Sequence, residues 1–524
     1  MTHRTLHDWF AGSAARHGDA VALEVGGYTL TYRHLDRTVD HIARAVLDTC
    51  DTTPRRVGLY ASRSVAAYAG YLAALRLGAT VVPLNPSFPA ARNERIVGNA
   101  ALDVVIAQDA DPGLPAPACV VDPSLAQRTA LALREPGPAS TGRRPDPEAA
   151  AYILFTSGST GAPKGVPVAH RSVDAYLRHV IPRYALGPGA RVTQTFDLTF
   201  DLSVFDLFCT WGSGAALVVP TRGDLLAPAR FVAARGITHW FSVPSAISLA
   251  QGLGRLAENS MPNLRWSLFC GEPLTLEQAR AWQRAAPGST MENLYGPTEL
   301  TLSCAQFRLP VGRAAWPVTA NGTVPVGELY PGLEALVVGY DHRPGTTGEL
   351  CVRGAQRFGG YLDPDDNRGR FVTFDGTRVT VWDQPAAPPE DAWYRTGDRV
   401  RDEDGCLVHL GRLDHQVKVQ GYRVELGEIE AVLRGHPQVT EAVVVAVRDD
   451  DGPMTLHAVC TGTGGGDGDE LLTLLRTKLP QHMIPRSLAF WRRFPLNSNG
   501  KVDRNAIGAA VMSANNNEAD ERRE

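Results

Sequence analysis

Strand-like and helix-like segments alternate along the N-terminal part of this chain, and the alternation limits the folds that it can adopt. Short runs of Val, Ile, Leu and Ala at 57–60, 79–84 and 103–107 are typical of buried strands. The segment 65–77 has the length and composition of a helix. Because strands that alternate with helices pack as a sheet with helices on its faces, the pattern predicts an α/β fold. The same alternation returns between about 150 and 300.

Later changes of pattern predict further parts of the fold. From about 320 to 410, short apolar runs separated by Gly and Pro indicate a small β-rich subdomain. After Leu413 the pattern becomes α+β. We expect helices at 428–433 and 471–479 and a strand at 442–447. These changes favour a separate C-terminal domain.

The length of 524 residues also exceeds what one simple core accommodates, so we predict several domains. The expected fold is α/β, with a large N-terminal domain of α/β layers that includes the β-rich subdomain, and a small α+β C-terminal domain. The predicted bounds are 1–413 for the N-terminal core, 414–512 for the C-terminal domain and 513–524 for a polar, disordered tail. Residues 109–147, rich in Pro, Ala, Asp and Gly, are predicted to form a long surface connection.

Composition and charge exclude several classes of function. A formal net charge of -4 offers no basic surface of the kind that binds nucleic acids or anionic membranes. No apolar run approaches the roughly 18 residues that span a bilayer, and residues 1–10 lack the apolar stretch of a signal peptide. The eight cysteines are scattered without a C-x-x-C pair, which argues against a zinc site or a disulfide framework. We therefore expect a cytoplasmic protein without nucleic-acid or membrane partners.

A loop of small residues follows the strand expected at 151–155. It reads Thr-Ser-Gly-Ser-Thr-Gly at 156–161, and Lys164 comes shortly after it. Small residues let backbone N–H groups approach an oxyanion, hydroxyls add donors and the lysine adds a charge, so the loop suits a triphosphate. It differs from the P-loop, in which Ser or Thr follows the lysine, because Gly165 follows Lys164 here. A flexible linker is the alternative interpretation, and the preceding strand argues against it.

This loop resembles the phosphate-binding signature of the adenylate-forming superfamily, which includes acyl-CoA synthetases, luciferases and the adenylation domains of nonribosomal peptide synthetases. Further segments that resemble its motifs occur in the superfamily's order over nearly the whole chain, at 30–35, 77–86, 293–299, 348–354, 394–398, 411–430 and 499–504. The resemblance implies an N-terminal adenylation core, a mobile C-terminal domain, and ATP and Mg²⁺ as cofactors.

Similarity to these motifs implies an ATP site, and the residue types suit it physically. The expected ATP-binding residues are Thr156, Ser157, Gly158, Ser159, Thr160, Gly161, Lys164, Gly271, Asn293, Tyr295, Gly296, Thr298, Asp398 and Arg412. Tyr295 offers a ring face for adenine, and Asp398 offers two acceptors for the ribose hydroxyls. Glu299 is expected to hold Mg²⁺ and, with Lys164, to be catalytic. Considered singly, these residues could instead be a packed tyrosine, a turn aspartate and a surface glutamate.

The C-terminal segment supplies the third expected catalytic residue, Lys501, on an Asn-Gly turn. Its ammonium can bridge the substrate carboxylate and the α-phosphate as pyrophosphate leaves. The resemblance implies that Asp414 is the hinge of the mobile domain and that Gly421 lies against the tunnel for the incoming thiol. The alternatives are an ordinary solvated lysine and a plain turn glycine.

Asp201 distinguishes the branches of the superfamily. By resemblance to amino-acid-activating members, it follows Phe200 and binds the substrate ammonium, whereas a helix N-cap is the alternative. The same resemblance gives a substrate pocket formed, with Asp201 and Lys501, by Leu202, Phe205, Ser245, Leu268, Cys270, Leu294, Leu302 and Ser303. The pocket is otherwise uncharged and contains bulky residues, which favours a small or medium uncharged amino acid. The segment 268–272 resembles D-alanine–carrier-protein ligases, so D-alanine is one candidate.

These features predict a ligase of the nonribosomal peptide synthesis type, which forms an aminoacyl-AMP. The aminoacyl group then passes to the phosphopantetheine thiol of a carrier protein. Because no carrier domain follows the Lys501 motif in this sequence, we expect the carrier in trans. A small accessory protein, activation of a β-amino acid, and an acyl- or aryl-acid CoA ligase remain open. An inactive binding relative would have lost Lys501, Glu299 or Asp398, and all three are present.

Overall fold

The computed structural model describes residues 3–122, 146–157, 163–319, 321–403, 405–414, 416–448, 454–462, 468–495 and 502–521. The chain forms two compact units. The first comprises Met1–Pro86, Asn93–Phe155 and Lys164–Leu413, and the second comprises Ser87–Arg92, Thr156–Pro163 and Asp414–Glu524. Whether these units also act as a catalytic core and a mobile domain stays a prediction.

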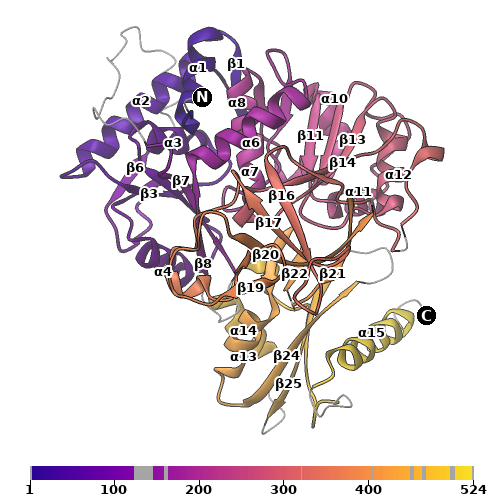
Figure 1. Ribbon diagram of the computed structural model, residues 1–524. Helices are drawn as coiled ribbons and strands as arrows, with labels where there is room; N and C mark the ends of the chain where they lie inside the picture. The colour runs from indigo at the N-terminus through magenta and orange to yellow at the C-terminus, as the bar shows by residue number, and fades with distance from the viewer. Residues whose placement is uncertain are drawn as a thin grey trace. The chain divides into compact units, whose positions relative to one another are not determined.

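The largest sheet of the first unit has the strand order β15-β14-β13-β12-β11-β9-β10-β1-β2. Its central pairs are parallel, from β13 through β12, β11, β9 and β10 to β1, and the outer pairs are antiparallel. The strands are β1 (Val21–Val25), β2 (Tyr28–Thr31), β9 (Arg191–Thr193), β10 (Ala216–Val218), β11 (His239–Ser242), β12 (Trp266–Phe269), β13 (Thr290–Tyr295), β14 (Ala305–Arg308) and β15 (Glu328–Leu329). In Figure 1, β11, β13 and β14 lie in one region of the sheet, near α10 (Pro228–Arg235) and α12 (Leu276–Ala285).

A second sheet in the same unit has the order β6-β5-β3-β4-β7-β8. Its strands are β3 (Arg56–Tyr60), β4 (Thr80–Leu84), β5 (Val104–Gln108), β6 (Ala118–Val121), β7 (Ala150–Thr156) and β8 (Lys164–Ala169). Helix α3 (Val65–Arg76) is buried from Val65 to Leu75 and belongs to the main hydrophobic core. The sequence prediction of a surface connection at 109–147 is wrong at β6, because Cys119 and Val121 are buried and the strand pairs with β5.

Other helices of this unit lie between its strands along the chain. They are α1 (Leu6–Arg16), α2 (Tyr32–Thr49), α6 (His170–Arg183), α7 (Leu202–Val204), the π-helix η1 (Phe205–Cys209), α8 (Thr210–Ser213), α9 (Arg222–Leu225), α11 (Ser245–Gly252) and the 3₁₀ turns η2 (Thr298–Leu300), η3 (Arg313–Ala315) and η4 (Pro364–Asn367). Helix α4 spans Ala90–Ala100. Within the described ranges, the structure has no helix that combines the length and apolarity needed to cross a membrane.

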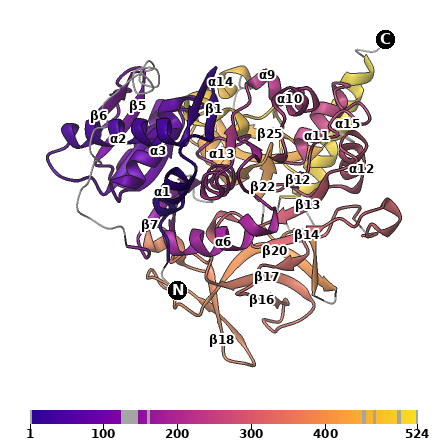
Figure 2. The ribbon, with the colours of Figure 1, turned by 90° about the horizontal axis from the view of Figure 1, so that it is seen from above.

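The β-rich subdomain predicted from the sequence is present in the first unit. Its strands are β16 (Leu333–Val338), β17 (Thr347–Gly354), β18 (Phe371–Phe374), β19 (Val379–Trp382), β20 (Trp393–Glu403) and β21 (Cys406–Arg412). All of their pairings are antiparallel, in the order β16-β17-β20-β18-β19, and β21 pairs with β20. Figure 2 shows β16, β17, β18 and β20 grouped together, apart from the helices α1 and α2. The long strand β20 carries one of the expected ATP-binding residues.

The second unit has the predicted α+β composition. Its elements are β22 (Gln416–Val419), β23 (Tyr422–Glu425), α13 (Leu426–Arg434), β24 (Val439–Arg448), β25 (Met454–Gly462), α14 (Gly468–Lys478), η5 (Gln481–Met483), β26 (Ser487–Phe490) and α15 (Arg504–Glu521). The expected disordered tail is wrong for residues 513–521, because they continue α15. Good helix formers such as Ala509, Ala510 and Met512 precede them, and Ile507 is buried, so the helix is anchored at its start. The α/β fold class and its smaller α+β part are thus confirmed.

Candidate functional site

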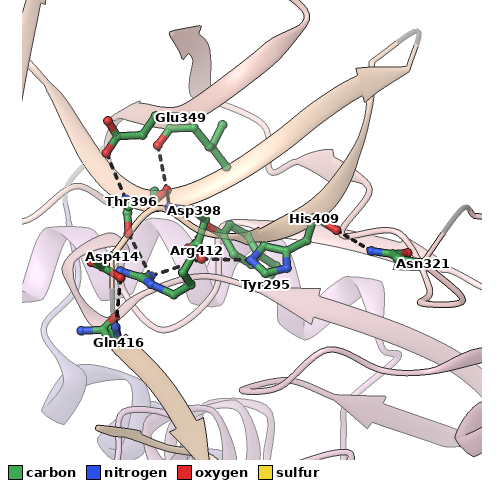
Figure 3. Close-up of polar contacts among 11 residues, drawn as sticks. Tyr295, Asn321, Glu349, Thr396, Asp398, His409, Arg412, Asp414 and Gln416 are labelled. Atoms are coloured by element: carbon green, nitrogen blue, oxygen red, sulfur yellow. Dashed lines mark hydrogen bonds and ion pairs between the residues drawn. The ribbon is translucent and has the colours of Figure 1, made fainter. Parts of the chain in front are cut away.

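Three side chains contact the carboxylate of Asp398, which is buried with 6% of its surface exposed. The Tyr295 hydroxyl, at the end of β13, donates to Asp398 Oδ2 at 2.7 Å. Asp398 Oδ1 lies 3.0 Å from His409 Nε2 and 3.2 Å from Arg412 Nη1, both on β21 (Figure 3). The backbone N–H of Asp398 donates to the Thr396 hydroxyl at 3.1 Å. Asp398 therefore sits in a strand with its carboxylate held by side chains, unlike the turn aspartate of the alternative interpretation.

The antiparallel register of β20 and β21 produces this arrangement. Asp398 pairs with Arg412, and a register shift between Arg399 and Val400 adjusts the pairing next to it. Burial and the neighbouring Asp398 carboxylate raise the pKa of Tyr295 well above its usual value, so its hydroxyl stays protonated and donates. His409 is a site residue that the sequence analysis missed. His409 reaches Asp398 because of the register in which β21 pairs with β20. The spacing of residues along the sequence does not predict that register.

Asp201, the expected ammonium ligand, is also buried, with 5% of its surface exposed. It stands before α7 with helical φ and ψ of -60° and -30°, and its side chain makes no capping hydrogen bond. The Thr298 hydroxyl instead donates to Asp201 Oδ2 at 2.7 Å. The structure therefore brings together an expected substrate residue and an expected ATP-binding residue 97 positions apart, and the N-cap interpretation loses its support.

Glu299 and Lys164 belong to a second buried polar cluster. Glu299 is fully buried, and the Tyr361 hydroxyl donates to its Oε1 at 2.6 Å. Lys164, the first residue of β8, has its Nζ 2.7 Å from Asp366 Oδ1 and 5.6 Å from the centre of the Tyr361 ring. A Cβ at Gly165 would lie 2.9 Å from Leu362 Cβ, so a glycine is needed there for the two segments to approach. Tyr361 and Asp366 are further residues that sequence reasoning missed.

The expected pocket residues are mostly inside the protein. Those that are buried with at most 2% exposure are Leu202, Phe205, Leu268, Cys270, Leu294, Leu302 and Ser303. Ser245 is half-buried at the start of α11, and its N–H donates to Glu272 Oε2 at 2.8 Å. A Cβ at Gly271 would lie 3.5 Å from Leu202 Cδ1, which places these two expected residues in contact distance. Ser303 Oγ is 2.9 Å from the Tyr330 hydroxyl and 3.3 Å from that of Tyr176, and the sequence pattern pointed to neither tyrosine.

Two expected ATP-binding residues, Asn293 and Gly296, have structural roles that the sequence analysis did not predict. Asn293 is buried in β13, and its Nδ2 donates to the carbonyl of Pro325 at 2.9 Å. Gly296 follows Tyr295 where the backbone of the next segment approaches closely, because a Cβ there would lie 2.5 Å from Ser303 Cα. A side chain at position 296 would therefore displace the segment that carries Leu302 and Ser303.

The remaining predicted residues are distributed as follows. Thr156 is the last residue of β7, and Ser157 follows it. Gly158, Ser159, Thr160, Gly161 and Lys501 lie outside the described residues. In the second unit, Asp414 Oδ1 accepts from Gln416 N–H at 3.3 Å. Gly421 occupies the hairpin turn between β22 and β23 with a φ of +84°, after Gln420 with a φ of +51°. In the described ranges, no three His, Cys, Asp or Glu residues group as metal ligands.

Comparison with known proteins identifies the family. The model of the AMP-binding enzyme matches residues 10–362, and that of the AMP-binding enzyme C-terminal domain matches residues 428–501. The probable non-canonical nonribosomal peptide synthetase CymA of Salinispora arenicola is 36% identical over 95% of this chain and 6% of its own length. The L-proline--[L-prolyl-carrier protein] ligase of Pseudomonas fluorescens is 31% identical over 97% of this chain and 99% of that protein.

A solved structure shares both units of the fold. The adenylation domain AlmE of Vibrio cholerae, in complex with glycyl-adenosine-5'-phosphate, has a TM-score of 0.80 and is 27% identical, and the match covers 98% of this chain and 99% of that one. The chain spans between 6% and 45% of the lengths of several peptide synthetases that it resembles. The family models and the nearly full-length match to the Pseudomonas ligase confirm what the ordered motifs indicate: this chain belongs to the AMP-binding enzyme family.

Proposed function

We propose that this protein activates an amino acid with ATP and forms an aminoacyl-adenylate. In this reaction a carboxylate oxygen of the amino acid attacks the α-phosphorus of ATP, and the bond from that phosphorus to pyrophosphate breaks. The observation that carries the proposal is the buried Asp201 carboxylate, which accepts from Thr298 beside the fully buried Glu299. An ammonium group is a cation that a buried carboxylate can bind, so Asp201 suits the amino group of an amino-acid substrate.

The cluster around Asp398 suits the nucleoside of ATP. Two oxygens held in place by Tyr295, His409 and Arg412 offer acceptors in a fixed orientation for ribose hydroxyls. The Arg412 and His409 side chains keep the carboxylate from turning away, so the binding geometry exists before the nucleotide arrives.

The residues near Glu299 suit magnesium that arrives with the nucleotide. Mg²⁺ is commonly held by one or two carboxylates together with substrate phosphates, and no all-protein ligand group was found among the described residues. Glu299 would hold the ion, which when bound would neutralise charge on the phosphates. Tyr361, through its bond to Glu299 Oε1, orients the carboxylate for this contact. Lys164 would bind the outer phosphates, and Lys501 would contact the reacting carboxylate and the α-phosphate.

The substrate that we propose is a small or medium amino acid with an uncharged side chain. Leu268, Leu294 and Leu302 are fully or almost fully buried apolar residues, so a charged side chain among them would lack a partner. The relative from Vibrio cholerae was solved with a glycyl adenylate, which is a small aminoacyl group. An acyl- or aryl-acid CoA ligase is the competing function, and Asp201 disfavours it because such substrates have no ammonium.

We further propose that the aminoacyl group passes to the phosphopantetheine thiol of a carrier protein. The thiol sulfur attacks the carbonyl carbon of the adenylate, a thioester forms, AMP leaves, and the thiol proton is released. The Pseudomonas relative is an L-proline--[L-prolyl-carrier protein] ligase, and this name supports the step. Because Lys501 is needed for adenylation and would obstruct the thiol, a hinge at Asp414 would let residues 414–512 serve both half-reactions.

One experiment tests the proposed activity directly. ATP–pyrophosphate exchange is measured with a panel of L-, D- and β-amino acids, each paired with the carboxylic acid that lacks its amino group. We expect exchange with one or a few small uncharged amino acids and none with the paired acids. Equal exchange with alanine and propionate, for example, would indicate that the ammonium is not recognised and would favour the CoA-ligase alternative.

A further inference from the structure

The pocket segment Thr301–Ser303, here called the pocket turn, has a backbone conformation that its residues do not favour. Thr301 and Leu302 have φ values of +59° and +62°. Residues with a Cβ rarely adopt a positive φ, and a β-branched residue such as Thr301 adopts it least readily. The Ser303 N–H donates to the Thr301 carbonyl at 2.8 Å, which closes a three-residue turn centred on Leu302. Strained turns of this kind persist only where surrounding contacts hold them.

Those contacts come from Gln356, which lies in the connection between β17 and β18 and is 3% exposed. Its side-chain Nε2 donates to the carbonyls of Leu300, at 3.1 Å, and Ser303, at 2.8 Å, on either side of the turn. Its backbone carbonyl accepts from the Thr301 hydroxyl at 2.7 Å. Gln356 therefore makes three hydrogen bonds, two to the pocket turn and one to Leu300, which precedes it.

The residues after Gln356 are themselves fixed in place. The Phe358 N–H donates to the Glu299 carbonyl at 2.9 Å, one residue before the segment that Gln356 holds. The buried guanidinium of Arg357 donates to the carbonyls of Pro389, at 3.0 Å, and Glu390, at 3.1 Å. The β-rich subdomain thus holds the backbone next to Gln356 in place, so the position of the Gln356 side-chain amide is fixed.

On its other side the pocket turn has no room to move toward β13. A Cβ built on Gly296 would lie 2.5 Å from Ser303 Cα and 3.0 Å from the Leu302 carbonyl oxygen. The turn is therefore confined between Gly296 and Gln356. If the amide were lost, two buried carbonyls would lack their donor, and Leu302 would be released toward a negative φ that moves its side chain.

We propose that Gln356 is a positioning residue for amino-acid selection, because it holds Leu302 and Ser303 in the conformation that shapes the substrate pocket. The inference rests on the proposed amino-acid activation and adds to it a residue outside all of the pocket positions that the sequence suggested. None of these hydrogen bonds joins Gln356 to Tyr295 or Asp398, the residues that we expect to bind the nucleotide. Its loss should therefore affect the amino acid much more than ATP.

The test is the substitution Gln356→Met, which keeps the length of the side chain and removes both donors. We expect the KM for the amino acid in ATP–pyrophosphate exchange to rise about tenfold, the KM for ATP to change by less than about twofold, and discrimination against larger amino acids to weaken. Gln283→Met is the matched control, because Gln283 contacts only Arg313 at the surface in the bonds described, and it should leave both KM values unchanged.

A second substitution separates positioning from general damage to the fold. Glycine adopts positive φ freely, so Thr301→Gly added to Gln356→Met should restore part of the amino-acid KM if the amide acts through the strained turn. Two results would overturn the proposal. One is an amino-acid KM of Gln356→Met equal to that of the wild type, and the other is a double variant whose amino-acid KM is higher than that of either single variant. If Gln356→Met does not fold, Thr301→Val removes one of the three bonds and should raise the same KM about threefold, and an unchanged KM there would overturn it as well.

The outcome also separates this inference from the proposed function. A wild-type enzyme that exchanges pyrophosphate with no amino acid refutes amino-acid activation, and with it the role of Gln356. A wild-type enzyme that is active, with a Gln356→Met variant of unchanged selectivity, refutes only the positioning role.

Discussion

Asp201 is the single residue on which the proposed amino-acid specificity depends most. Its carboxylate is buried and accepts from Thr298, and the N-cap role that a sequence pattern would assign to it has no hydrogen bond in the structure. A buried carboxylate in this position is suited to bind a cationic group of the substrate.

We predict that Asp201→Ala abolishes amino-acid-dependent pyrophosphate exchange. Removal of one partner of a buried charge pair costs roughly 2–5 kcal/mol, which corresponds to a loss of about 30-fold to 5,000-fold. Asp201→Asn, which keeps the shape and an acceptor for Thr298, should be nearly as inactive because the charge is gone. Asp19→Ala is the control, since Asp19 is 91% exposed and pairs only with Arg33 in the ion pairs described. Wild-type exchange by Asp201→Ala would sink the ammonium-binding role.

Lys164 leads to a second prediction at this scale, because its ammonium is bound to Asp366 at 2.7 Å. If Lys164 binds the phosphates of ATP, Asp366 competes with the nucleotide for the same ammonium. Asp366→Asn should then lower the KM for ATP by about three- to tenfold, or about 0.7–1.4 kcal/mol, whereas Lys164→Ala should raise it. The Asp366 variant should also melt at a lower temperature, because it leaves a buried lysine without this partner.

Asp365→Asn is the matched control for Asp366→Asn. Asp365 is on the same 3₁₀ turn η4, is 75% exposed and pairs with Arg368 at the surface, so neither the KM for ATP nor the melting temperature should change. A KM for ATP that rises in Asp366→Asn as it does in Lys164→Ala would show that the pair acts together rather than in competition.

At the scale of elements, the hairpin of β22 and β23 changes the interpretation of Gly421. Val419 pairs with Tyr422, so Gln420 and Gly421 form a two-residue turn, and both have positive φ. A turn of this geometry favours glycine or asparagine for conformational reasons alone. Gly421 is thus explained by the hairpin whether or not a pantetheine arm passes it, and a bulky substitution would strain the turn as well as fill space.

Gly421→Asn separates these two effects, because asparagine tolerates positive φ but adds a side chain. If the tunnel assignment holds, this variant keeps the melting temperature and the adenylation rate of the wild type and loads carrier about tenfold more slowly, since the added atoms narrow the path. Gly421→Leu serves for comparison and should lose both stability and loading. Loading by Gly421→Asn at the wild-type rate, measured with a labelled amino acid on a phosphopantetheinylated carrier, would leave Gly421 with a turn role only.

At the scale of the whole molecule, buried histidines make stability depend on pH. His170 begins α6, and its Nδ1 accepts from Leu6 N–H at 3.1 Å, which joins α1 to α6. Burial lowers the pKa of His170 to about 4, and burial likewise lowers the pKa of His239 to about 4. A pKa that is lower in the folded state than its unfolded value of 6.5 contributes stability above pH 6.5. That stability is lost as the pH falls from 6.5 to about 4.

We predict that the melting temperature falls over this pH window, and that His170→Asn reduces the fall. Asn keeps an acceptor near the position of Nδ1 and is not protonated in this pH range. The variant therefore avoids a decrease in the free energy of unfolding that reaches about 3 kcal/mol in the wild type. The difference in melting temperature between wild type and variant should therefore shrink from pH 7 to pH 4.5 in scanning calorimetry. A difference that is constant over this range would contradict the assignment.

The sequence by itself determined the family, the fold class and the local character of most elements. Short apolar runs predicted β3, β4 and β5 within one or two residues, because buried strands are rich in Val, Ile, Leu and Ala. The motifs, which occur in the order typical of the family, predicted candidate site residues, among them Asp201, Glu299 and Asp398. Local pattern failed where an element depends on a distant partner: β6 is a strand because it pairs with β5, and α15 continues a helix whose start is buried.

Only the tertiary structure decided how the candidate site is assembled. Tyr295 and His409 meet at Asp398 through the pairing of β20 with β21 and the end of β13, and no spacing along the chain encodes such a register. Gln356 reaches the pocket turn from 55 positions away along the chain. Its role follows from two positive φ values and three hydrogen bonds that have no sequence signature. Residue types report what chemistry a chain can perform, whereas long-range packing determines which of those residues are held together to perform it.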